Sequence, residues 1–228
     1  MCSTAAVQAA LKAFGGAVDW RNDPYDDAAR RVYDLLLALA EDIAKGRVLP
    51  QQVESRLMDI LESGHVASHY GGQEMSGFTP SRILAQQRGR AVALGQNSYV
   101  RGLVTALLAK DSRYWSEEAG EWRQEPLQSR LGSYVGRTRG TAYDGWTSAA
   151  PPYMLYEWRL GGVEEHCEDC PTLSETGPWL STEDTSQLQY PTLFTTPGEC
   201  DTPCLFNCAC HLERVADGAT GPMPFRFK

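Results

Sequence analysis

The stretch Tyr25–Lys45, YDDAARRVYDLLLALAEDIAK, decides the fold class of this 228-residue chain. Its apolar side chains recur at the spacing of one face of a helix, at Ala29, Val32, Leu36, Leu39 and Ile43. Asp26 and Asp27 lie where acidic residues favour a helix start, and Lys45-Gly46 is a plausible stop. The pattern predicts an amphipathic helix that packs against others.

Further helices are expected on both sides of a glycine-rich gap. Pro50 opens a shorter helix that we expect to end near Gly64, followed by a loop through Gly71–Gly77. Thr79-Pro80 is a helix-start signal, and the helix that follows is expected to reach Lys110. Another helix is predicted over 118–142. The chain is therefore expected to be mainly α.

Composition changes at Ala149–Pro152, and we place a domain boundary there. The predicted parts are a helical body, 1–150, and a small irregular or β module with a tail, 151–228. A strand is expected over 153–160, and a hairpin strand over 188–196. The chain has no run of 18 apolar residues and no basic leader, so we expect neither a membrane span nor a secretory signal.

Six of the seven cysteines fall in the second part, within a 44-residue window. They form the pair Cys167-x-x-Cys170 and the cluster Cys200, Cys204, Cys208 and Cys210. Thiolates at this spacing suit a tetrahedral zinc site. The predicted ligands of a structural Zn²⁺ are Cys167, Cys170, Cys204 and Cys208.

Other uses of these cysteines stay open. Six thiols could form three disulfides, hold an iron–sulfur cluster or remain reduced, although zinc is favoured in a reducing compartment. Cys200 or Cys210 could replace one of the predicted ligands, and so could His166, which precedes the first pair. Cys208 and Cys210 are two residues apart, so in extended chain they would point to opposite faces.

Charge is distributed unevenly along the chain. Residues 1–150 carry 17 basic and 17 acidic side chains, whereas residues 151–228 carry 4 basic and 12 acidic ones. The acidic cysteine-rich part is a poor match to a phosphate backbone. The segment 82–139 has ten basic residues against five acidic ones, so weak, salt-sensitive DNA binding would map there.

Motifs of enzyme sites are missing from the sequence: it has no G-x-S-x-G, no H-E-x-x-H and no glycine-rich phosphate loop. His65 and His69 have a helical metal-binding spacing. Their stretch is glycine-rich and offers no evident acidic partner for a metal site, so we interpret them as surface or packing histidines. We expect a protein without enzymatic activity.

The segment Glu157–Gly162, followed by Glu165-His166-Cys167-x-x-Cys170, resembles the C-terminal part of phage minor head proteins of the Mu F-like head-morphogenesis group. The later run, Pro197-Gly198 through Asn207-Cys208-Ala209-Cys210 to Glu213, is similar to the closing motif of that group. The likeness spans roughly residues 130–215. Cys200 stands where that group has glycine, and Ala209 where it commonly has a basic residue.

This resemblance implies a virion structural protein near the portal of the phage head, made in the host cytoplasm and active in head morphogenesis. It implies portal or capsid proteins as partners, an oligomeric arrangement in the virion, and at most weak contact with packaged DNA. The alternative is a nucleic-acid-binding zinc module that acts in DNA packaging or ejection. The acidic balance of the cysteine-rich part argues against that alternative.

Overall fold

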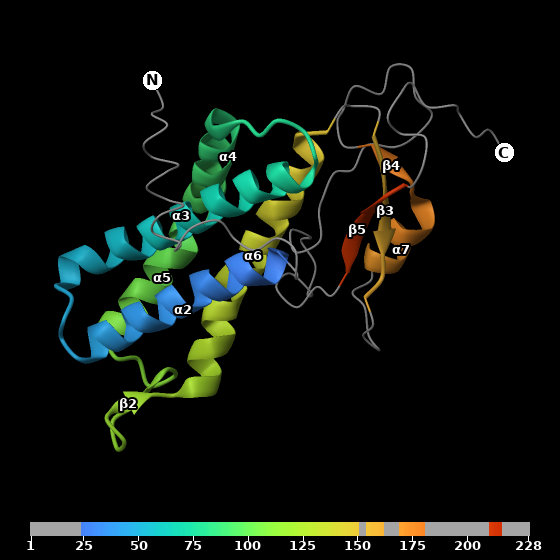
Figure 1. Cartoon of the computed structure of the whole chain (residues 1–228). Coiled ribbons are helices and arrows are strands. Elements are labelled where there is room, and N and C mark those ends of the chain that lie inside the picture. Colours follow the sequence, from blue (N-terminus) through green and yellow to red (C-terminus); the bar gives the residue numbers. More distant parts are fainter. Residues whose placement is uncertain (1–23, 151–153, 162–168, 181–209, 216–228) are drawn as a thin grey trace.

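The computed structural model describes residues 24–150, 154–161, 169–180 and 210–215 (Figure 1). The prediction of a mainly α chain is confirmed over these residues. Five long helices form the body: α2 (Pro24–Ala44), α3 (Pro50–Met75), α4 (Arg82–Gly95), α5 (Asn97–Leu108) and α6 (Gln124–Ser148). None of the described helices combines the length and apolar character needed to cross a membrane.

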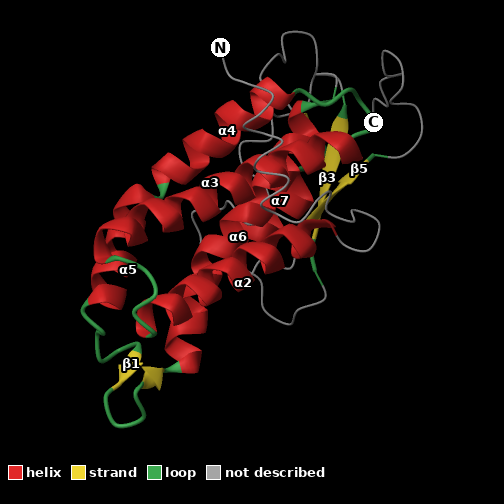
Figure 2. Cartoon of the chain, turned by 60° about the vertical axis from the view of Figure 1, so that its left-hand side comes forward, coloured by secondary structure: helices red, strands yellow, loops and turns green. Residues whose placement is uncertain are grey.

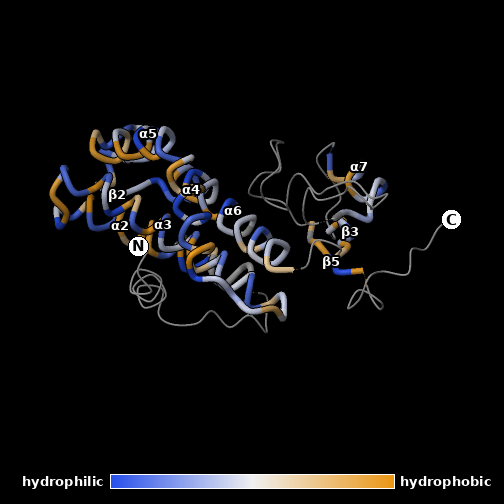
Figure 3. Tube along the Cα trace, turned by 90° about the horizontal axis from the view of Figure 1, so that it is seen from above, coloured by the Kyte–Doolittle hydropathy of each residue, from blue (hydrophilic) through white to orange (hydrophobic). Residues whose placement is uncertain are grey.

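The body is built around α3, which packs against α2, α4, α5 and α6 (Figure 2). Figure 3 shows hydrophobic and hydrophilic residues alternating around these helices, as expected for helices with one face in a core. The predicted stripe of α2 is the buried one, since Val32, Leu36 and Leu39 are at most 6% exposed. The sequence pattern therefore located both this helix and its core face.

Helix α3 is longer than predicted: it continues through Gly64, Gly71 and Gly72 to Met75. These glycines lie buried in the body, where α6 packs on α3. A Cβ atom on Gly72 would lie 1.9 Å from the carbonyl oxygen of Ala142 in α6. The expected loop was wrong because glycine here permits close helix packing, and tertiary contact outweighs its low helix propensity.

The helix expected from Thr79 to Lys110 is two helices. Ser81 caps α4, with its hydroxyl accepting a 3.3 Å hydrogen bond from the Leu84 nitrogen. The first helix ends at Gly95, Gln96 separates the two, and α5 starts at Asn97. Gln96 is the C-cap of α4 in a right-handed conformation, with φ of −89°, so the chain passes into α5 with only a one-residue break.

A small antiparallel hairpin precedes α6, made of β1 (Trp115–Ser116) and β2 (Glu121–Trp122). Consequently α6 begins six residues later than the predicted start at 118, and it continues to Ser148. The hairpin is joined to the body through Trp122, whose indole nitrogen donates a 2.8 Å hydrogen bond to the Ala40 carbonyl. The rings of Trp115 and Trp122 meet edge to face at 4.8 Å.

The second part has a three-stranded antiparallel sheet in the order β4-β3-β5, with helix α7 (Asp169–Thr176) beside it. Its strands are β3 (Leu155–Arg159), β4 (Trp179–Leu180) and β5 (His211–Arg214). The predicted strand over 153–160 is confirmed as β3. The hairpin strand expected over 188–196 lies outside the described residues.

The described side chains form two hydrophobic clusters, one in the body and one around the small sheet. Tyr143 and Ala150, which precede the predicted boundary, belong to the second cluster, and Trp146 packs against it. The C-terminal end of α6 thus contributes side chains to the hydrophobic cluster of the small sheet. That the parts before and after residue 150 are separate domains stays a prediction.

Candidate functional site

Two buried cysteines mark the candidate metal centre. Cys170 lies in the first turn of α7, and Cys210 immediately precedes β5; each is 1% exposed. Both belong to the hydrophobic cluster around the small sheet, together with Trp158, Trp179 and Leu212. One cysteine from each half of the cysteine motif is therefore brought into the same buried cluster.

The central strand β3 fixes this arrangement. Trp158 pairs with Leu212 and Arg159 pairs with His211 across β3 and β5, so the register of β5 places Cys210 near the end of β3. Helix α7 packs on β3 from the other half of the motif. Trp179 holds the end of α7, because its indole nitrogen donates a 2.9 Å hydrogen bond to the Leu173 carbonyl.

Of the four predicted zinc ligands, Cys170 alone is among the described residues. Cys167, Cys204 and Cys208 lie outside them, as do Cys200 and His166. Within the described ranges, no group of three or more His, Cys, Asp or Glu side chains could hold a metal ion. The predicted ligand set stays a prediction.

The donor chemistry of the two described cysteines fits a structural zinc site. Their thiols sit in an apolar, tryptophan-rich shell, and thiolate is the ligand that zinc favours where no catalytic water is needed. Cys210 was interpreted as a spare cysteine, on the argument that it and Cys208 point to opposite faces. Its burial in the same cluster as Cys170 makes it a candidate ligand as well.

Arg214, at the end of β5, joins the sheet to the helical body. Its guanidinium donates a 2.9 Å hydrogen bond to the Ser76 carbonyl at the C-terminus of α3. The same guanidinium lies 5.7 Å from the ring centre of Phe78 and 5.6 Å from that of Trp146. Burial raises the pKa of the neighbouring Tyr156 to about 12, against the opposing effect of the Arg214 charge.

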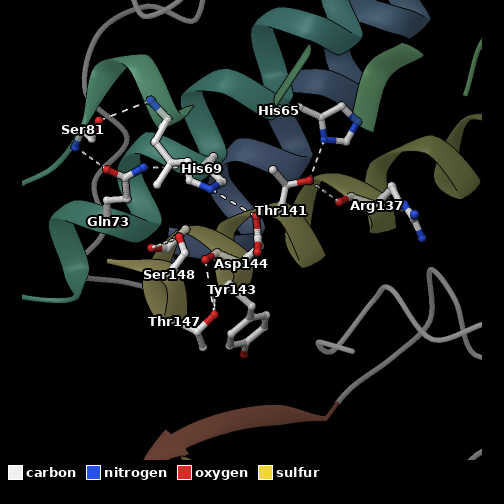
Figure 4. Close-up of polar contacts among 12 residues, drawn as sticks. His65, His69, Gln73, Ser81, Arg137, Thr141, Tyr143, Asp144, Thr147 and Ser148 are labelled. Atoms are coloured by element: carbon white, nitrogen blue, oxygen red, sulfur yellow. Dashed lines mark hydrogen bonds and ion pairs between the residues drawn. The ribbon is translucent and has the colours of Figure 1, made fainter. Parts of the chain in front are cut away.

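A second polar cluster lies between α3 and α6 (Figure 4). The Nε2 atom of His69 is 3.1 Å from the Oδ2 atom of Asp144, and its Nδ1 atom is 2.8 Å from the Nε2 atom of Gln73. An amide nitrogen can only donate, so Nδ1 accepts and the ring proton lies on Nε2, facing the carboxylate. The amide oxygen of Gln73 accepts from the nitrogen of Ser81, which caps α4.

His65 lies one turn earlier and is fully buried. Its Nδ1 atom is 2.8 Å from the hydroxyl of Thr141, which itself donates to the Arg137 carbonyl at 3.0 Å. Since that hydroxyl proton is used, Nδ1 is the donor to Thr141. Desolvation lowers the pKa of His65 to about 3, so the buried imidazole is neutral near neutral pH. A side-chain hydrogen bond to Gln96 opposes this shift, and the charge of Arg137 adds to it.

These contacts correct one prediction about the histidines. His69 does have an acidic partner, Asp144, which lies 75 positions later and so gave no local signal. Both rings are 0% exposed, which fits the packing interpretation and leaves no route for substrate to reach them in the described structure. The contacts of His65 with Thr141 and of His69 with Asp144 link α3 to α6 and help to fix how the two helices meet. Neither Nε2 atom makes a well-aligned hydrogen bond in the described structure.

Comparison with known proteins finds no matching family model, no matching curated protein and no matching solved structure.

Proposed function

We propose that this chain is a structural protein of a bacteriophage head, positioned near the portal and acting in head morphogenesis. The helical body would contact portal or capsid proteins, and the cysteine-rich module would be stabilised by Zn²⁺. The chain would be made in the host cytoplasm and assembled into the virion. No enzymatic step is part of this proposal.

One observation carries the proposal beyond the sequence motif. Cys170 and Cys210 come from opposite halves of that motif, 40 residues apart, and both are buried in one small cluster beside β3. In the described residues of this module, the apolar side chains belong to a three-stranded sheet and one short helix. A bound metal would supply the stability that so small a core lacks.

The metal is proposed to be structural for a chemical reason. Four thiolates close the coordination shell of Zn²⁺, so no position remains for an activated water or a substrate. The burial of Cys170 and Cys210 at 1% exposure is consistent with a shell that excludes solvent. The function would then lie in the surfaces that the module orients.

Two measurements test the proposal separately. Elemental analysis of the purified chain should give about one zinc per molecule, since four sulfur ligands fill one site. Mass spectrometry of purified phage particles should detect the chain as a virion component. Its absence from particles would contradict the virion assignment even if zinc is bound, and absence of metal would contradict the module alone.

A further inference from the structure

Helix α4 buries its small residues and exposes its large apolar ones. The buried positions are Ala85, Gly89 and Ala93, spaced four apart and facing α3. A Cβ atom on Gly89 would lie 2.5 Å from the backbone nitrogen of Val66, so the contact depends on glycine. The outward Ile83 and Leu94 are 58% and 54% exposed. The helix therefore needs neither of these two large side chains for its own packing.

The exposed face of α4 is also cationic. Ile83 and Leu94 are eleven positions apart and lie on one line along the helix, and Arg90 lies close to that line. Arg88 lies about a third of a turn further round, at the edge of the exposed half of the helix. Both arginines are exposed, and α4 carries no carboxylate at all. Within the described part of the chain, neither guanidinium is in an ion pair. This surface, Ile83, Arg88, Arg90 and Leu94, is called the α4 face below.

A complementary surface lies on the hairpin between β1 and β2. The exposed Glu117 and Glu118 lie in its turn, and the exposed Glu121 starts β2. Between them, Gly120 is left-handed with φ of 65°. Like Arg88 and Arg90, these three carboxylates have no ion-pair partner within the described residues. The hairpin is fixed rigidly, because Trp122 is hydrogen-bonded to Ala40 in the core. This surface is called the acidic tip.

Helix α4, which carries the α4 face, and the hairpin, which carries the acidic tip, lie at opposite ends of the helical body (Figures 1 and 2). They are too far apart to pair within one molecule, yet each can meet its complement on another copy. We propose that the α4 face of one copy docks the acidic tip of a second copy, in a head-to-tail contact. A heterologous contact of this kind repeats from copy to copy, giving a closed ring or an open filament.

Two other occupants of the α4 face fit its composition less well. Duplex DNA would match the arginines, but a phosphate backbone gains nothing from the apolar line that runs through Ile83 and Leu94. An anionic membrane surface would match both, but interfacial helices bury a broad apolar face, and here Gln87 and Ala91 interrupt the line. A protein surface with carboxylates and small apolar residues, such as the Ala119-Gly120 turn, meets all of these features.

The test uses the full-length chain under reducing conditions, followed by sedimentation velocity over a range of protein concentrations. A helix face and a hairpin tip bury less than the roughly 1,000 Å² of a stable interface, so we expect weak, salt-sensitive association. Arg88→Glu/Arg90→Glu and Glu117→Lys/Glu118→Lys should each weaken self-association by about tenfold or more. Arg56→Glu and Leu49→Ser, exposed residues elsewhere on the body, should leave it unchanged.

Mixing the two charge-reversed variants is the decisive arm. Each variant keeps one native surface, so the mixture should regain association that neither protein shows alone. Misfolding of either variant could not produce this rescue. A wild-type chain that stays monomeric at all concentrations, or a mixture without rescue, would overturn the proposal. So would a monomer whose Arg88 and Arg90 instead bind duplex DNA or anionic phospholipid vesicles. The result is independent of metal content and of the virion assignment.

Discussion

The guanidinium of Arg214 donates a 2.9 Å hydrogen bond to the carbonyl of Ser76, 138 residues earlier in the chain. Ser76 caps the C-terminus of α3, and its hydroxyl donates to the carbonyl of Gln73 at 2.6 Å. The strand β5, which follows Cys210 directly, is thereby tied to the end of the central helix. Folding of the cysteine-rich module and of the helical body should be coupled through this contact.

Arg214→Gln should lower the free energy of unfolding by about 2 kcal/mol, because it removes a charged hydrogen bond and two cation–ring contacts. Arg159→Gln on the neighbouring strand is the matched control. Arg159 donates to Glu213 at 2.9 Å, but its side chain is 52% exposed, and exposed ion pairs contribute about 1 kcal/mol at most. Chemical denaturation of both variants measures the difference; equal losses would contradict a special role for Arg214.

Gly72→Ala and Gly145→Ala should each destabilise the chain by about 3 kcal/mol or more, since overpacking against backbone cannot be relieved by a side-chain rotation. The added Cβ atoms would lie 1.9 Å from the Ala142 carbonyl oxygen and 2.1 Å from that of His69. Gly102→Ala is the control, because nothing lies within 4 Å of its Cβ position. Its expected effect is a gain of about 0.5–1 kcal/mol from helix propensity, seen as a higher Tm.

Acid should weaken the helical body through His65. Its folded-state pKa of about 3 is below the unfolded value of 6.5, so the unfolded chain takes up the proton first. The stabilisation is complete above pH 6.5 and is lost progressively as the pH falls toward 3, by up to about 1.4 kcal/mol per pH unit. Urea titrations at several pH values in this range give the free energy of unfolding at each pH. This free energy should fall less steeply with decreasing pH for His65→Gln than for the parent chain.

Removing the metal should unfold the cysteine-rich module first. Cys167→Ser and Cys208→Ser should lose the zinc and the module together, and Cys200→Ser should keep both, if the predicted ligands are right. Cys170→Ser and Cys210→Ser distinguish the two halves of the buried cluster. Zinc content and tryptophan fluorescence of each variant give the readout. If Cys210→Ser loses its metal while Cys208→Ser retains it, the zinc ligand is Cys210 and not Cys208.

Much of the body was predictable because its signal is periodic and local. The apolar stripe of α2 and the aromatic strand β3 were found with nearly correct bounds. The C-terminal end of α3 was predicted wrongly because glycine occurs both in loops that end helices and at close contacts between helices. Gly72 of α3 and Gly145 of α6 lie where the two helices meet, and such glycines within helical stretches were the signal available in the sequence.

The candidate site was harder to predict because its contacts are distant in sequence. Nothing near His69 indicated Asp144, and nothing near Ser76 indicated Arg214. The zinc chemistry drawn from the cysteine motif stays a prediction, and alternation along an extended chain could not tell which of Cys208 and Cys210 faces the core. The strand register did so for Cys210, through the pairing of Trp158 with Leu212.

The crossing of α3 and α6 has a mechanical consequence. The backbone of α6 approaches α3 closely at Gly72, next to Ala142, and the backbone of α3 approaches α6 closely at Gly145, next to His69. Sliding along the axis would drive a neighbouring side chain into a carbonyl group, and rotation would separate His69 from Asp144. The two helices are therefore locked against both sliding and rotation relative to each other. We expect a force applied at one end of the helical body to reach the other end with little relative movement of α3 and α6.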